Sequence, residues 1–192
     1  MARLHKDQGG VAMIEFALAL PVLMGLILVG LELTNYVLAN HRVRQIAAMT
    51  ADNASRLRTQ MSEAYINQLF VGVDKAGAGI QFKDRGRVIL SSVQNNSAAN
   101  GQWIRWQRCY GQLSHNSKYG PQGKGQTDAS LPSINGLTAQ PGSAIMYAEA
   151  EYQYKPLIPS SFLKNRTIVS EVAFIVRQRT DFSISGSNAS TC

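Results

Sequence analysis

Histidine and cysteine, on which many enzymes depend, are scarce in this chain. The three histidines, His5, His41 and His115, lie far apart in the sequence, and neither an H-E-x-x-H nor a G-x-S-x-G motif is present. Gly123-Lys124-Gly125 lacks the earlier glycine and the following Ser or Thr of a phosphate-binding loop. The sequence therefore predicts a protein that is not an enzyme and that has no catalytic residues, metal site or cofactor.

Only two cysteines are present, Cys109 and Cys192, so neither a CxxC redox pair nor a four-ligand zinc site can be assembled. In an exported protein two cysteines can form a lasting disulfide, because the periplasm is oxidising. A bridge between them would close a loop of roughly 80 residues. On the chain-entropy model it would stabilise the fold by up to about 4.5 kcal/mol, because it restricts the unfolded chain. We expect this disulfide if the chain is exported; two free thiols are the alternative.

Long apolar stretches are also few, since the only one able to cross a membrane runs from Val11 to Leu33. About 20 apolar residues cross a hydrocarbon core about 30 Å thick. The 192 residues therefore provide one membrane span and one modest globular domain. Arg3 and Lys6 precede the stretch, and short basic flanks tend to remain cytoplasmic. This predicts a single-pass membrane protein with a cytoplasmic N-terminus and an exported C-terminal domain.

A carboxylate, Glu15, interrupts the start of this apolar stretch. Placing an ionised group in hydrocarbon costs roughly 2.5–3.5 kcal/mol on insertion scales, so intramembrane carboxylates usually have a partner and a role. A cut between Gly10 and Val11 would make Glu15 the fifth residue and create an amine four residues before it. Glu15 is therefore the first candidate for a functional residue.

The basic leader, the Gly9-Gly10 pair, Glu15 and the apolar stretch together resemble the class III signal of type IV pilins and pseudopilins. In those proteins a membrane peptidase cuts after the glycine and leaves the apolar helix attached. The resemblance implies a leader of residues 1–10, a processing site at Gly10 and Val11, and a prepilin peptidase as partner. Two alternatives remain open, namely a secretory signal peptide removed near Ala39 and an anchor that is never cut.

Phe16, Pro21 and Gly30-Leu31-Glu32-Leu33 are similar to the TadE-like family of tight-adherence (Tad) pilus proteins. The similarity is specific over roughly residues 9–60 and thins to residues 146–159 further on. It implies a minor pseudopilin of the Tad (Flp) pilus, because TadE-like proteins carry an exported domain that major pilins lack. Such a subunit would help to initiate, anchor or tip the pilus and so contribute to adhesion. The implied partners are the major Flp-type pilin, other minor pseudopilins and the inner-membrane Tad platform.

The resemblance also assigns roles within an assembly helix that contains Glu15, Phe16 and Pro21. By analogy with pilins, the Val11 amine of one subunit would pair with Glu15 of its neighbour, which neutralises a charge that lipid penalises. Proline removes a backbone hydrogen bond and would let the helix change shape between bilayer and filament, although prolines also occur in membrane helices for structural reasons alone. The alternative function is an unprocessed, membrane-anchored periplasmic binding or adhesion protein.

A helical pattern continues beyond the apolar stretch. Apolar residues recur at steps of three, four or seven from Tyr36 to Leu69. The domain organisation that follows is a transmembrane and assembly helix over 11–33 and a helix extension over 34–72. Gly72 and the glycines of 77–79 would end the helix, as glycines often do.

The remaining residues, 73–192, are expected to form the exported β-rich domain. Alternating side chains predict strands, of which the first two would form a hairpin. The expected ranges are 80–83, 87–93, 102–109, 144–154 and 167–177. The predicted fold class is α+β, with a long N-terminal helix packed on an antiparallel sheet as in pseudopilins.

Composition sets two further expectations. Residues 111–142 are rich in Gly, Ser, Asn, Gln and Pro, which predicts an exposed insertion rather than core. The formal charge of +7 could attract anionic lipids, acidic glycans or nucleic acid, but a soluble basic domain is the interpretation we favour. Trp103 to Arg108 interleaves aromatic and basic side chains as single-strand platforms do. Ordinary strand packing explains this better, so no nucleic-acid partner is expected.

Overall fold

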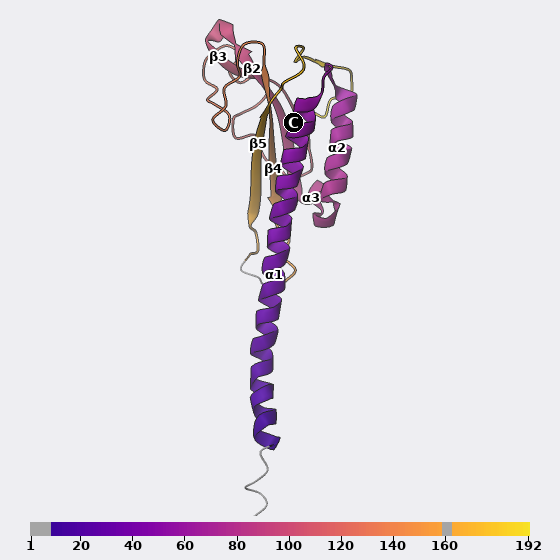
Figure 1. The fold of residues 1–192 in the computed structure, drawn as a ribbon, viewed down its shortest axis with the longest axis vertical. Helices are drawn as coiled ribbons and strands as arrows, with labels where there is room; N and C mark the ends of the chain where they lie inside the picture. The colour runs from indigo at the N-terminus through magenta and orange to yellow at the C-terminus, as the bar shows by residue number, and fades with distance from the viewer. Residues whose placement is uncertain (1–8, 159–162) are drawn as a thin grey trace, which may run out of the picture.

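A computed structural model of the chain describes residues 9–158 and 163–192, so most of the predicted leader and Pro159 lie outside it. The first element is helix α1 (Gly9–Arg56), which has 48 residues. Its C-terminal half packs on an antiparallel sheet, while its N-terminal half stands clear of the domain (Figure 1). The predicted class, α+β with a long N-terminal helix on an antiparallel sheet, is confirmed.

The surroundings of α1 change at Glu32. The side chains from Val11 to Leu31 are exposed, whereas Glu32 and Ala39 are buried. At roughly 1.5 Å per residue the free part is about 32 Å long, close to the thickness of a hydrocarbon core. By length and composition α1 could therefore cross a membrane, with a mean hydropathy of 2.4 over its most apolar window.

The sheet has four strands in the spatial order β3-β2-β4-β5, and each neighbouring pair is antiparallel. The strands are β2 (Gly86–Asn96), β3 (Gly101–Tyr110), β4 (Ala144–Gln153) and β5 (Thr167–Ile175). A short parallel pair joins β1 (Met61–Ser62) to β6 (Ile184–Ser185). The single-turn 3-10 helices are η1 (Ala78–Ile80) and η2 (Ser97–Ala99). The strands expected over 87–93, 102–109, 144–154 and 167–177 are thus present.

The helix extension expected over 34–72 is not one helix. α1 ends at Arg56, and a second helix, α2 (Glu63–Gly77), lies beside it (Figure 1). Ser62 caps α2 by accepting a hydrogen bond from the Tyr65 N–H at 3.2 Å.

The size of the sheet explains this break. Strands of this length span about 30–36 Å, and the stretch of α1 from Ala39 to Arg56 already covers about 27 Å of that. A straight continuation would carry Ile66 and Phe70 past the sheet, whereas the reversal buries both in the core that α1 shares. Because each half keeps the same helical period, the periodicity could not reveal the break.

The hairpin expected over 80–93 is also wrong, because Phe82–Arg85 forms a short helix, α3, and β2 pairs with β3 and β4 instead. Packing of Phe82 accounts for this, since its side chain is fully buried between two glycines. A Cβ at Gly77 would lie 2.4 Å from Phe82 Cβ, and one at Gly86 would lie 2.5 Å from Phe82 Cε2. The aromatic ring therefore turns inward as part of a helix rather than along a strand.

Both faces of the sheet are covered. The face toward α1 and α2 carries the larger core, which includes Ile46, Leu90 and Met146. The opposite face carries a second core made by strand residues and the 111–142 segment, which contributes Leu131 and Ile134. The expectation of a wholly exposed insertion is thus wrong. A few apolar side chains scattered through a polar segment are enough to cover one face of a sheet.

A β-bulge in β3 separates Ile104 from Trp106. The register shifts between Ser92 and Val93, so that Trp106 faces Ser92 and Ile104 faces Val93. Trp106 consequently packs in the helix-side core and Ile104 in the second core, although their spacing placed them on one face. Trp106 is buried, as expected of strand packing rather than of a nucleic-acid platform.

Candidate functional site

The residues predicted for processing and assembly all lie on the free half of α1. Gly10 and Val11 are in its first turn, and both are exposed. The N–H groups of a first helical turn have no partner within the helix, so this turn opens at little cost. The structure therefore leaves the Gly10–Val11 bond accessible.

Glu15 projects from this free segment among apolar side chains. Its neighbours one turn away are Val11, Ala12, Leu18 and Ala19, which are apolar and exposed. Within the part of the chain that the structure describes, Glu15 makes no hydrogen bond or ion pair. A partner for this carboxylate would have to come from outside the described residues.

Phe16 and Pro21 continue the same surface. Phe16 is 65% exposed, and Pro21 lies inside α1. A proline there cannot donate a hydrogen bond to the carbonyl of Ala17, four residues earlier. The segment thus combines a lone carboxylate, an exposed aromatic ring and a locally weakened helix.

A second carboxylate, Glu32, marks where the free half ends. Its side chain is 1% exposed, and its Oε1 accepts a hydrogen bond from the Tyr154 hydroxyl at 2.9 Å. Its Oε2 accepts from the N–H groups of Leu157 and Ile158, both at 3.0 Å. The role of Glu32 was not predicted, and the signal for it in the sequence is a charged residue within an apolar stretch.

The residues around Tyr154 complete this junction. The Asn35 side chain donates to the Tyr154 hydroxyl at 2.8 Å, and the Tyr36 ring meets the Tyr154 ring edge-on at 5.1 Å. Burial, with a further contribution from Glu32 and despite the opposing effect of Asn35, raises the pKa of Tyr154 to about 12. We call Glu32, Asn35, Tyr36, Tyr154 and residues 155–158 the junction; it fixes the apolar helix to the end of β4.

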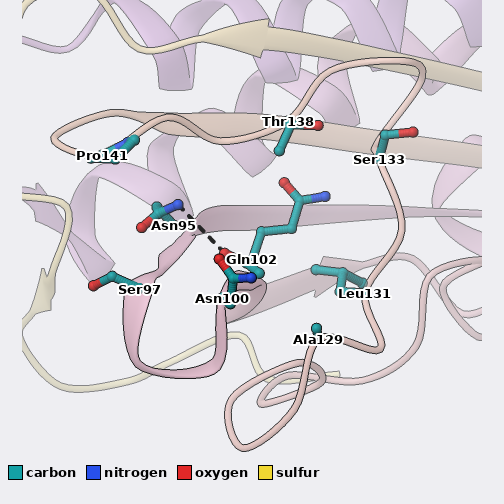
Figure 2. Close-up of a pocket in the computed structure, with 10 residues that line it drawn as sticks. Asn95, Ser97, Asn100, Gln102, Ala129, Leu131, Ser133, Thr138 and Pro141 are labelled. Carbon is teal, nitrogen blue, oxygen red and sulfur yellow. Dashed lines mark hydrogen bonds between the residues drawn. The ribbon is translucent and has the colours of Figure 1, made fainter.

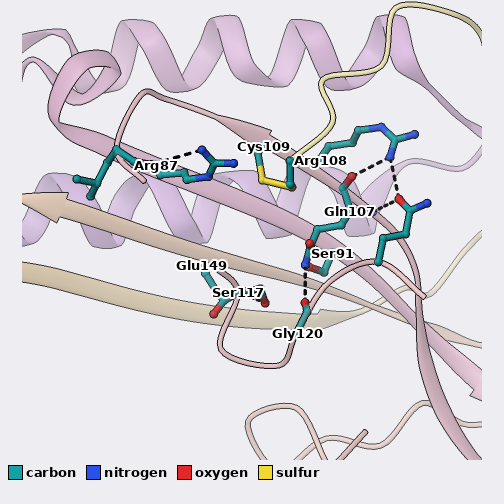
Figure 3. Close-up of a disulfide and its surroundings, with 11 residues drawn as sticks. Arg87, Ser91, Gln107, Arg108, Cys109, Ser117, Gly120 and Glu149 are labelled. Atoms are coloured by element: carbon teal, nitrogen blue, oxygen red, sulfur yellow. Dashed lines mark hydrogen bonds between the residues drawn. A yellow bond between two sulfur atoms is a disulfide. The ribbon is translucent and has the colours of Figure 1, made fainter. Parts of the chain in front are cut away.

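A disulfide joins Cys109 to Cys192, which lie 83 positions apart in the sequence and have Cα atoms 4.9 Å apart (Figure 3). The Cys109 N–H also donates to the Ser190 carbonyl at 2.8 Å. Ser190 Oγ in turn donates to the Asn67 side chain at 2.7 Å. The tail is therefore fastened to both β3 and α2.

Arg108, next to the disulfide, forms a buried ion pair with Glu63. Its Nε lies 3.0 Å from both carboxylate oxygens, and its Nη2 also donates to Oε1. Arg108 Nη1 donates to the Gln107 carbonyl at 2.7 Å (Figure 3). This pair connects β3 to the start of α2, so it serves the fold rather than a ligand.

A hollow of about 440 Å³ lies where β2 turns into β3 (Figure 2). This turn is at the end of the domain away from the free helix (Figure 1). Two of the side-chain amides that line the hollow are already bonded within the chain: Asn95 donates to Gly101 and Ala139, and Gln102 donates to Pro132. In the described part of the chain no three His, Cys, Asp or Glu side chains gather closely enough to hold a metal ion.

Comparison with known protein families gives a match over the first part of the chain. A family model described as "TadE-like protein" matches residues 10–52. The matched stretch contains Gly10, Glu15, Phe16, Pro21 and Glu32, so the resemblance to the TadE-like family is confirmed there, and it indicates a component associated with a Tad pilus. No curated protein and no solved structure matches the chain.

Proposed function

We propose that this TadE-like chain is a minor pseudopilin of a Tad pilus, anchored by α1 and assembled through Glu15. The observation that carries the proposal is a carboxylate that has no partner among the described residues, on an exposed apolar helix about 32 Å long. A structural role of this kind needs no catalysis, and we assign the chain none.

Processing is the first step of the proposal. A prepilin peptidase cuts the Gly10–Val11 bond in the first turn of α1 and releases the leader. The new Val11 amine is positively charged at neutral pH, since α-amino groups have a pKa of about 7.7–8.0. The cut thereby adds a cation to a segment that previously held only the Glu15 carboxylate.

Pairing between subunits is the second step. One turn of helix is about 5.4 Å, so the Val11 amine and Glu15 of one chain lie on the same side of α1, about one turn apart, and present both charges to a neighbouring helix. When helices stack, the amine of one subunit meets Glu15 of the next, and each buried charge gains its counter-ion. An unpaired Glu15 in lipid would take up a proton instead.

The exported domain distinguishes a minor subunit from a major one. The junction holds this domain at the end of the free helix, which would place it at the outer surface of the inner membrane. The free helix can then pack with the major Flp-type pilin and other minor pseudopilins, while the domain remains outside the helical core. This arrangement supports a role at the start, base or tip of the pilus, with the Tad platform as assembly partner and adhesion as the result.

Substitution of Glu15 tests the proposal. Glu15→Ala and Glu15→Gln are expected to enter the membrane normally but to be lost from sheared filaments, because both remove the negative charge. Met13→Ala is the matched control, since Met13 is 76% exposed on the same segment and carries no charge. Immunoblots of membranes and filaments provide the measurement. Normal incorporation of both Glu15 variants into filaments would refute the pairing and favour an uncut membrane anchor.

A further inference from the structure

Arginines from two distant parts of the chain meet at the end of α1. Arg56 is the last residue of α1 and Arg58 follows it, while Arg177 comes shortly after β5. The three side chains line one hollow of about 450 Å³. Its other lining residues are Asp52, Ser55, Phe174, Ile175 and Gln178. We call this the arginine hollow.

The charges in the arginine hollow are not balanced. Arg56 Nε donates to Asp52 Oδ1 at 2.7 Å. Arg58 and Arg177 are exposed and make no hydrogen bond or ion pair within the described residues. Three guanidinium groups thus lie around one carboxylate. The repulsion between these positive charges does not stabilise the fold. An anion placed between Arg58 and Arg177 would relieve that repulsion.

The end of a helix normally disfavours an anion, because its last carbonyls carry partial negative charge. Arg179 offsets this effect. It is 4% exposed, and its Nη1 donates to the Ala54 carbonyl in the last turn of α1 at 3.1 Å. Its Nε has no partner, and within the described residues it makes no ion pair with a carboxylate. Arg179 therefore places a buried positive charge against the last turn of α1, although it does not itself line the hollow and Asp181 also acts on its charge.

The membrane that α1 could enter is too far away to supply that ligand. From Leu31 to Arg56 the helix rises about 37 Å, whereas charges in physiological salt are screened over about 8 Å. Phospholipid headgroups around the free helix are thus out of reach of the arginine hollow.

The remaining lining residues indicate which kind of anion the arginine hollow could bind. Asp52 would repel a simple anion, but it accepts hydrogen bonds from hydroxyl groups, and the Gln178 amide can both donate and accept. Phe174 and Ile175 add an apolar wall, and ligand pockets commonly combine such walls with a few polar groups. A sugar that carries a carboxylate has the anion, the hydroxyls and the apolar ring face that this combination requires.

We propose that the arginine hollow binds a carboxylate-bearing sugar unit of an acidic glycan. Arg58 and Arg177 hold the carboxylate, because guanidinium groups form paired hydrogen bonds with it. Asp52 and Gln178 take the hydroxyls, and the ring lies against Phe174. This binding depends only on the domain, so it does not require that α1 be processed or assembled.

The test is titration calorimetry of the full chain in a neutral detergent with trigalacturonate as the probe. The unchanged protein is expected to bind it and to give no signal with neutral maltotriose. Arg58→Gln/Arg177→Gln should weaken binding at least about tenfold, because charge-assisted hydrogen bonds are lost. Arg42→Gln/Arg44→Gln is the matched control: it removes the same charge from exposed positions of α1, and the affinity should change less than about twofold.

Three results would overturn the assignment. The first is the absence of trigalacturonate binding by the unchanged protein. The second is an equal loss in the two double variants, which would mean diffuse attraction by net charge. The third is binding of inorganic phosphate without the trisaccharide, which would leave an oxyanion site but no glycan site. Tryptophan fluorescence of each variant verifies that it is folded, because Trp106 is buried in the core.

Discussion

The Tyr154 hydroxyl lies 2.9 Å from Glu32 Oε1, although the two residues are 122 positions apart in the sequence. Glu32 stands where the free half of α1 ends, and Tyr154 follows the last residue of β4. The N–H groups of Leu157 and Ile158 donate hydrogen bonds to the other oxygen of the same carboxylate. This buried carboxylate thereby joins α1 to the end of β4, in addition to the packing of the C-terminal half of α1 on β4 and β5.

Glu32→Ala should destabilise the domain. The change leaves the Tyr154 hydroxyl and two backbone N–H groups without their acceptor, and a buried polar group without a partner costs about 1–3 kcal/mol. We expect a loss of about 3 kcal/mol or more, and a smaller loss for Glu32→Gln, which keeps one carbonyl oxygen. Urea unfolding in a neutral detergent, followed by tryptophan fluorescence, measures both. An unchanged unfolding midpoint for Glu32→Ala would show that the hydrogen bonds of Glu32 do not stabilise the domain.

Tyr154 should contribute to loss of stability at alkaline pH. Its pKa is raised from 10.0 to about 12 in the folded protein, mainly by burial. The unfolded chain loses this proton first, so the contribution is complete below pH about 10 and disappears as the pH rises to about 12. Burial also raises the pKa of Tyr65, Tyr110, Tyr147 and Tyr152. The contribution of Tyr154 is therefore measured by comparing a variant with the unchanged protein. Above pH about 10 the free energy of unfolding should fall less steeply with pH in Tyr154→Phe than in the unchanged protein.

Reduction of the disulfide should release the tail. On the chain-entropy account a loop of this size is worth about 4.5 kcal/mol, and the short β1–β6 pairing cannot replace it. Dithiothreitol should lower the unfolding midpoint and make residues near Ser183 sensitive to protease. Cys109→Ser/Cys192→Ser is the control and should show the same low stability without any response to dithiothreitol. A reduced protein of unchanged stability would contradict the prediction.

Truncation of a side chain in the second core should destabilise the domain as much as truncation of one in the first. Ile134 is 0% exposed in the 111–142 segment, so Ile134→Ala is expected to cost about 2–5 kcal/mol. Val71→Ala serves as the comparison, because Val71 is 55% exposed on α2 and its loss should cost less than about 0.5 kcal/mol. Equal effects of the two substitutions in urea unfolding would mean that the segment does not cover the sheet as described.

The features that were predictable from sequence are those set by local pattern. The apolar run and the alternation within β4 and β5 each extend over many residues, so they identify the long helix and the antiparallel strands. The pair Cys109 and Cys192 was predictable for a different reason, since two cysteines in an exported chain allow one bridge only.

The features that were missed depend on contacts between distant segments. The length of the sheet decides where α1 must stop, and no window of sequence contains that length. Phe82 turns inward because Gly77 and Gly86 leave room for its ring. Arg58 and Arg177 are 119 positions apart and become neighbours only where α1 and β5 end together. Glu32 likewise acquires its role only when residues 154–158 return to α1.

The most direct test of the central claim is the N-terminal residue of the mature protein. Intact mass and N-terminal sequencing would be measured on protein from its native membrane, with and without the Tad prepilin peptidase. We predict a start at Val11 that requires the peptidase and makes Glu15 the fifth residue. A retained Met1, or a start near Asn40 in both strains, would contradict assembly through Glu15.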